Sequence, residues 1–166
     1  MVAANHFSNL DPVIVGVTVK RPMRYLAVDE LYGNSRLFDS FTKFAGAIPM
    51  TRTKIPFGPL KLALSELAAG GTVGLFPEGV RVWAWGEQPP KRGAAWLAHR
   101  AGVPLVPIAV SDSDLAMGRG ARRIFRTAMH VEICRPILPE TYQNEADPVG
   151  AMTEEWATRI DRALKQ

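Results

Sequence analysis

A histidine and an aspartate five positions apart, His6 and Asp11, are the residues of this chain best suited to acid–base chemistry. An imidazole can take a proton from a hydroxyl, while a carboxylate fixes its tautomer and stabilises the imidazolium that forms. On one helix a five-residue step turns by ~140°, so the two side chains would point apart. They can meet if His6 lies on extended chain and Asp11 opens a helix, and Pro12 suits such a start because the first helical turn does not need its missing N–H. The alternative is that Asp11 only caps the helix and His6 is a turn residue.

Further candidate site residues occur in two later segments. Arg52 follows a short apolar segment, and its guanidinium could bind a phosphate through two parallel hydrogen bonds. In the segment 76–81, Glu78 could hold substrate hydroxyls, Gly79 would let the backbone come close, and Arg81 would add a second cation. Taken singly, each segment has an ordinary interpretation, as a surface arginine and as a Pro-Glu-Gly turn.

The chain around these residues alternates between strand and helix patterns. We predict strands at 2–4, 25–28, 47–50, 72–76 and 105–110, and an edge strand at 129–133. We predict helices at 13–19, 35–45, 58–69, 93–100 and 148–166; the first should be buried, and Trp156 in the last should face the core. This alternation predicts a single-domain α/β fold with a mostly parallel mixed sheet flanked by helices. Ligands bind such sheets at the carboxyl ends of strands, where Arg52, Glu78 and the loop after Val110 fall.

The composition of the chain limits the classes of protein to which it can belong. A chain of 166 residues, 47% hydrophobic and 22% charged, can bury a core and is not expected to be disordered. A net charge of +4 suits anionic partners such as phosphates, CoA, lipid headgroups or nucleic acid. The single Cys134 cannot form an intramolecular disulfide, and we find neither a signal-peptide pattern nor an apolar run of ~18 residues. We therefore expect a cytoplasmic protein, soluble or peripheral at the inner face of the cell membrane.

Four sequence blocks, in this order and spacing, resemble those of the glycerol-3-phosphate and 1-acyl-glycerol-3-phosphate (lysophosphatidic acid) acyltransferase family of bacterial type. They are N-H-x-x-x-x-D at 5–11, G-x-I-x-x-x-R at 46–52, F-P-E-G-x-R at 76–81 and V-P-x-x-P at 103–107. Lys91-Arg92-Gly93 also resembles the basic-glycine step that precedes a helix in this family. The blocks extend from Asn5 to Ile108.

The resemblance implies acyl transfer from acyl-CoA or acyl-acyl carrier protein to a hydroxyl of a glycerophosphate or lysophospholipid acceptor. No metal or redox cofactor is implied. By match of position, His6 would be the general base and Asp11 its partner. Arg52 and Arg81 would bind the acceptor phosphate, and Glu78 and Gly79 would line the acceptor site.

The chain also departs from the family pattern. The family usually has a strand and membrane-associating helices before the first block, whereas four residues precede Asn5, so residues 1–166 would form an acyltransferase domain without its amino-terminal lead-in elements. Val80 stands where the family often has threonine, and a segment containing Trp83 and Trp85 replaces a polar stretch. These two rings either give weak contact with a membrane interface or pack in the core.

Two other readings stay open at the level of sequence. The chain could be a truncated, catalytically silent homologue that binds lipid or a partner protein. The basic cluster formed by Arg119, Arg122, Arg123 and Arg126 is either a solvated face or a docking site for anionic lipid or CoA phosphates. A nucleic-acid module is not expected, because only Phe125 places an aromatic ring within this cluster.

Overall fold

The computed structural model describes residues 1–28, 48–50, 57–121 and 123–165. The predicted helix at 35–45 and the candidate residue Arg52 lie outside these residues. The elements are, in chain order, β1 (Val2–Ala4), α1 (Asp11–Val19), β2 (Met23–Val28), β3 (Ile48–Met50), α3 (Phe57–Ala68), β4 (Thr72–Leu75), α4 (Gly93–Ala101), β5 (Val106–Ser111), α5 (Ser113–Met117), β6 (His130–Ile133), the 3-10 helix η2 (Pro139–Tyr142) and α6 (Pro148–Leu164).

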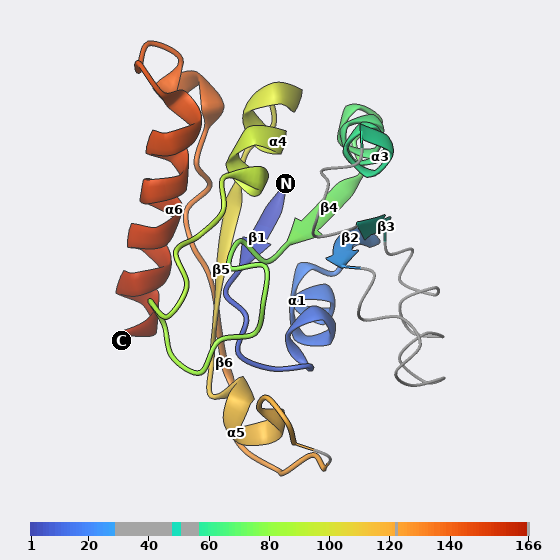
Figure 1. Ribbon diagram of the computed structural model, residues 1–166, viewed down its shortest axis with the longest axis vertical. Coiled ribbons are helices and arrows are strands. Elements are labelled where there is room, and N and C mark those ends of the chain that lie inside the picture. The colour runs from blue at the N-terminus through green and yellow to red at the C-terminus, as the bar shows by residue number, and fades with distance from the viewer. Residues whose placement is uncertain (29–47, 51–56, 122, 166) are drawn as a thin grey trace.

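The strands form a mostly parallel sheet in the order β3-β2-β4-β1-β5-β6 (Figure 1). The central strand β1 pairs in parallel with β4 and β5, and β2 pairs in parallel with β4 and β3. Only the edge strand β6 is antiparallel among the strands that the structure describes. The predicted α/β class, the mostly parallel sheet and the edge strand near residue 130 are confirmed.

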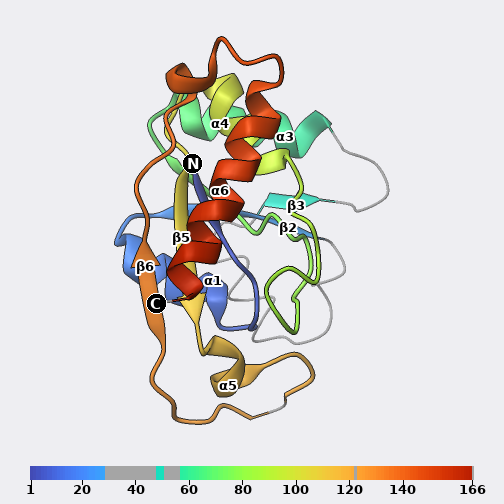
Figure 2. The same cartoon turned by 90° about the vertical axis from the view of Figure 1, so that its left-hand side faces the viewer.

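Helices cover both faces of the sheet, and the alternating side chains of β1 contact the two layers in turn. Met1 and Ala3 belong to the core cluster that includes residues of α3, α4 and α6, whereas Val2 and Ala4 pack with Val15 of α1. Figures 1 and 2 accordingly show α6 and α1 on opposite faces. This two-sided burial explains why β1 reads as an uninterrupted apolar run.

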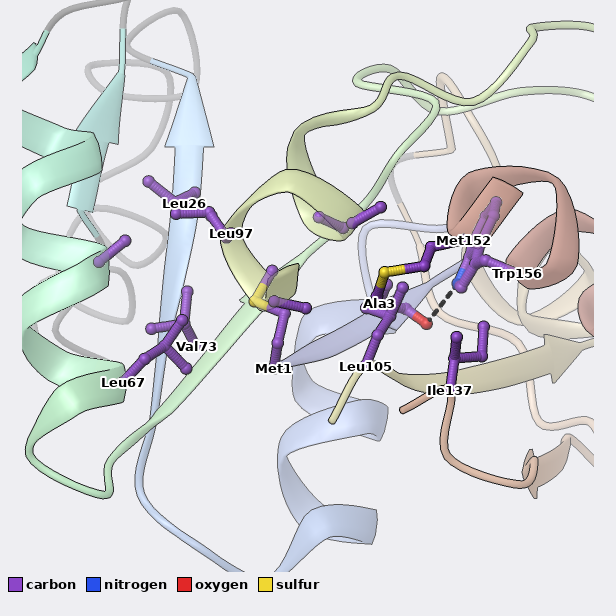
Figure 3. Packing of buried hydrophobic residues seen from close by; sticks show 14 of the residues in the cluster. Met1, Ala3, Leu26, Leu67, Val73, Leu97, Leu105, Ile137, Met152 and Trp156 are labelled. Atoms are coloured by element: carbon purple, nitrogen blue, oxygen red, sulfur yellow. Dashed lines mark hydrogen bonds between the residues drawn. The ribbon is translucent and has the colours of Figure 1, made fainter. Parts of the chain in front are cut away.

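Trp156 joins the last helix to the central strand. Its ring is buried, and its indole N–H donates a hydrogen bond of 3.0 Å to the carbonyl oxygen of Ala3 (Figure 3). A buried indole needs such a partner, since an unpaired N–H in the core would be destabilising. The prediction that Trp156 faces the core is confirmed.

Two local predictions differ from the structure. Helix α1 begins at Asp11 and is not buried all round: Val15 is buried, but Val13 and Val17 are 40% and 71% exposed. An apolar helix against one face of a sheet still exposes its outer side, and composition alone did not reveal that side. Helix α5 was not predicted, because five residues are too few to show a helical period.

The described residues include no helix that combines the length and the apolar character needed to cross a bilayer.

Candidate active site

The site begins where β1 ends, with the side chain of Asn5 bound to β5. Asn5 is fully buried; its Nδ2 donates to the carbonyl oxygen of Val110 (2.9 Å) and its Oδ1 accepts from the Val110 N–H (2.8 Å). The amide thus acts like one more peptide group in the parallel pairing of β1 with β5. It holds the start of the following loop against a residue 105 positions away in the sequence.

His6 and Asp11 are in contact. Asp11 Oδ2 lies 2.8 Å from His6 Nδ1 and also accepts the backbone N–H groups of Phe7 and Ser8, each at 2.7 Å. Asp11 is fully buried, whereas the His6 side chain is 14% exposed. A carboxylate can only accept a hydrogen bond here, so it favours the tautomer with the proton on Nδ1, in which a neutral imidazole has Nε2 free to accept a proton.

The local chain conformation explains how a five-residue spacing brings these side chains together. His6 lies two residues past the end of β1, and Asp11 is the first residue of α1. The Asp11 carboxylate therefore extends back over the loop that it closes. The expected helix start at Asp11 is confirmed, and His6 lies outside any helix, in the loop between β1 and α1. The second reading of Asp11, as a helix cap only, does not account for its contact with the imidazole.

Two aromatic rings support the imidazole and the first turn of α1. The ring of His6 stacks on Phe76, with centroids 4.2 Å apart and planes inclined by 21°. Tyr25 stacks on Phe76 in turn, and its hydroxyl donates to the carbonyl oxygen of Pro12 at 2.6 Å. The orientation of the imidazole is therefore set by packing as well as by Asp11.

Glu78 contacts the same loop from the turn that follows β4. Its Oε1 accepts the N–H of His6 at 3.2 Å, and the residue is 3% exposed. Burial raises the pKa of Glu78 to about 7, and the charge of Asp11 acts in the same direction. Within the described part of the chain, Glu78 Oε2 is buried without a hydrogen-bond partner. A protonated Glu78 would have one O–H to donate.

Cationic side chains surround the turn that carries Glu78. A Cβ on Gly79 would lie 2.7 Å from Lys91 Nζ, so the glycine lets this amine come close. Arg81 is partly exposed, and partial burial together with the charge of Arg119 lowers the pKa of its guanidinium, while Asp11 opposes the change. Arg119 lies over the ring of Trp83, 5.7 Å from its centroid.

The two tryptophans of this segment have different environments. Trp83 is 64% exposed, whereas Trp85 packs at the edge of the core with its ring 5.7 Å from that of Trp156. The sequence left open whether these rings are exposed or packed in the core; Trp83 is exposed, and Trp85 is packed against the core.

The structure thus brings four predicted site residues, His6, Asp11, Glu78 and Arg81, to the carboxyl side of the sheet, with Gly79 between the last two. The position of Arg52 lies outside the described residues. Sequence reasoning gave no role to Asn5, although it stands directly before His6. It also did not connect Arg119 with this site, and no local pattern could have done so. In the described ranges, no three His, Cys, Asp or Glu side chains gather as metal ligands.

Comparisons with known proteins agree with this architecture. A sequence model of the family described as Acyltransferase matches residues 1–111. Among solved structures, the 1-acyl-sn-glycerophosphate (LPA) acyltransferase PlsC from Thermotoga maritima is similar, with a TM-score of 0.75 and 20% sequence identity. The match covers 98% of this chain and 65% of the PlsC chain, and at that identity it shows the fold alone. No curated protein matches the sequence.

Proposed function

This chain belongs to the Acyltransferase family, and from that premise we propose that it moves a fatty acyl group from a thioester donor to a hydroxyl of a glycerophosphate or lysophospholipid acceptor. The donor would be acyl-CoA or acyl-acyl carrier protein. The observation that supports the proposal best is the contact between the buried Asp11 carboxylate and His6 Nδ1, because it leaves Nε2 as a base.

In the proposed reaction His6 Nε2 takes the proton of the acceptor hydroxyl as its oxygen attacks the thioester carbonyl. The tetrahedral intermediate collapses, the C–S bond breaks, and the thiolate leaves. The imidazolium then returns the proton to the sulfur, so the base is regenerated. Asp11 stabilises the charged imidazole during both transfers, and stacking on Phe76 prevents the ring from turning away.

The remaining predicted residues would hold the acceptor. We propose that Arg81 binds its phosphate together with Arg52, for which the family motif is the only support. Glu78 and Gly79 would line the acceptor site. The free Oε2 of Glu78 supports this role, since a neutral carboxyl group there could donate a hydrogen bond to an acceptor oxygen.

The assay that tests this proposal follows thiol release from acyl-CoA with and without lysophosphatidate, and detects the product by mass. We expect acceptor-dependent release and a product heavier by one acyl group. A folded protein that releases no thiol with any glycerophosphate acceptor, from acyl-CoA or from acyl carrier protein, would instead be the silent homologue that binds lipid without chemistry.

We also propose weak, salt-sensitive binding to anionic membranes at the inner face of the cell membrane. Support comes from a basic-apolar patch, which we define by its exposed side chains: Trp83, Leu115, Arg123, Ile124, Phe125 and Arg126. The Phe125 N–H donates to the carbonyl oxygen of Ala116 at 2.9 Å, which places this loop beside α5. Exposed apolar side chains among arginines suit the surface of a bilayer with negative headgroups.

A further inference from the structure

Arg119 is presented toward the site by a turn that is fixed at both ends. The Ala121 N–H donates to the carbonyl oxygen of Gly118 at 3.1 Å, and Gly120 has φ +84°. Positive φ at the third residue is what a type II turn requires, and it leaves Arg119 at the second position. A Cβ on Gly118 would lie 2.9 Å from the Asp114 carbonyl oxygen, so the turn packs tightly on the end of α5.

Two long-range hydrogen bonds connect this turn and the Trp83 segment to the loop that carries the base. Ser8 Oγ donates to the carbonyl oxygen of Met117 at 2.6 Å, two residues before Arg119. The N–H of Val82 donates to the carbonyl oxygen of His6 at 2.9 Å, one residue before Trp83. The contact of Arg119 with the Trp83 ring therefore joins two segments that are each bound to the same loop.

Arg81 and Arg119 carry like charges that the described residues leave unneutralised. No carboxylate of the described ranges lies within ion-pair distance of either guanidinium. The nearest influences on Arg81 are the repelling charge of Arg119 and the attracting charge of Asp11, and Asp11 is already bound to His6. Two like charges held near each other are stabilised by a bound anion.

We infer that Arg119, seated on Trp83, completes with Arg81 a two-guanidinium site for the phosphate monoester of the acceptor. The inference rests on the proposed function and adds a residue outside the four family blocks. The chemistry that recognises the ligand is a phosphate with two negative charges, which a pair of guanidiniums can bind through several parallel hydrogen bonds. The same chemistry occurs in the 3′-phosphate of CoA, so the acceptor and the donor must be varied separately.

The decisive variant is Arg119→Gln, assayed with a short-chain lysophosphatidate below its micelle concentration so that membrane binding plays no part. We expect the acceptor KM to rise roughly 5- to 30-fold, the factor that one or two lost kilocalories represent. The kcat and the donor KM should stay within about twofold. Arg119→Lys should fall between, because lysine keeps the charge but not the planar fork or the stacking. We also expect a higher acceptor KM for Trp83→Ala, which removes the ring under Arg119, and for Gly118→Ala, which disturbs its turn, because both displace Arg119 without removing it. The matched control is Arg100→Gln, an exposed arginine at the end of α4.

Two further measurements separate this inference from the proposed function. A monoacylglycerol acceptor lacks the phosphate, so Arg119→Gln should not alter its KM. Calorimetric titration of glycerol 3-phosphate without donor should show binding to the wild-type protein and weaker binding to Arg119→Gln, whether or not the chain transfers acyl groups. An unchanged acceptor KM, a rise in the donor KM alone, or no glycerol 3-phosphate binding by the wild-type protein would each overturn the inference. A wild-type protein that binds glycerol 3-phosphate through Arg119 but transfers nothing would contradict only the proposed reaction.

Discussion

The site has two parts that are held in different ways. The acid–base part consists of Asn5, His6, Asp11 and Glu78, of which three are buried and each makes at least one hydrogen bond shorter than 3.3 Å. The cationic part consists of partly or fully exposed side chains, among them Arg81 and Arg119; Arg119 stacks on Trp83, and its charge repels that of Arg81. Hydrogen bonds hold the first part in place, because breaking one of them in the core would leave a buried polar group unpaired and lower the stability.

In the proposed function, this difference would separate chemistry from recognition. A base must be placed within a few tenths of an ångström of the proton that it takes, so it needs a buried framework. Recognition of a phosphate tolerates more movement, because charge acts over longer distances and long side chains can adjust. We therefore expect substitutions in the acid–base part to act on the rate or on folding, and those in the cationic part to act on affinity.

The largest effect should come from His6→Ala. Removing the base should lower acyl transfer by roughly two to four orders of magnitude while the protein stays folded, as followed by thiol release and circular dichroism. His130→Ala is the matched control, since His130 is an exposed histidine on β6. Near-normal turnover in a folded His6→Ala protein would show that His6 is not the general base and that the acid–base part does not set the rate.

Asn5→Ala should show how far the acid–base part depends on the sheet. The change leaves the buried N–H and carbonyl oxygen of Val110 without their side-chain partner. We expect the free energy of unfolding in urea to fall by roughly 2–6 kcal/mol, about 1–3 kcal/mol for each of the two unpaired groups. Asn144→Ala, in an exposed loop, should change it by less than about 0.5 kcal/mol. Equal effects of the two substitutions would mean that Asn5 does not bind β1 to β5.

The raised pKa of Glu78 predicts that the stability of the fold depends on pH. Its pKa is about 7 in the folded chain, above the ordinary 4.5, so the folded state holds the proton more tightly. The stability that this proton contributes is complete below about pH 4.5 and is lost as the pH rises through 7, by roughly 3 kcal/mol in all. Glu78→Gln should lack this loss. Urea unfolding between pH 4.5 and 8 would reveal this loss as a difference in the free energy of unfolding between the wild-type protein and Glu78→Gln that grows with pH. Parallel curves, as expected for the exposed Glu140→Gln, would argue against a buried neutral carboxyl group.

The smallest effect concerns the basic-apolar patch. An Ile124→Ser, Phe125→Ser double variant should sediment with anionic vesicles roughly 5- to 10-fold more weakly than the wild-type protein, because less apolar area enters the bilayer. Binding should also weaken as salt is added. The control is Leu62→Ser, an exposed leucine on α3. Equal losses in both variants would show that membrane contact is not localised to this patch.

Local patterns were sufficient for much of the fold. The strand before Glu78 is confirmed to within one residue, and the last helix occupies Pro148–Leu164 with Met152, Trp156 and Ile160 buried at steps of four. Such periods follow from the geometry of strands and helices, so they can be read from neighbouring residues. Helix α5 was missed because five residues are too few to show a helical period, and the exposed side of α1 was missed because it depends on what the rest of the chain covers.

For the site, the sequence determined that His6 and Asp11 lie close together along the chain and can meet if a helix starts at Asp11, but only the structure decided between that contact and the alternative of a helix cap. In the structure the helix starts at Asp11, and its carboxylate turns back over the loop that carries His6. The sequence also determined that the Glu78 turn follows a strand of the same parallel sheet. It could not determine the contacts that depend on distant partners. The bond from Asn5 to Val110 spans 105 residues, and the bond from Ser8 to Met117 spans 109. Trp85 packs against Trp156 of α6, whereas Trp83, two residues earlier, is exposed. Those contacts arise when the sheet brings its strands together, because residues far apart in sequence become neighbours only through the packing of the whole chain.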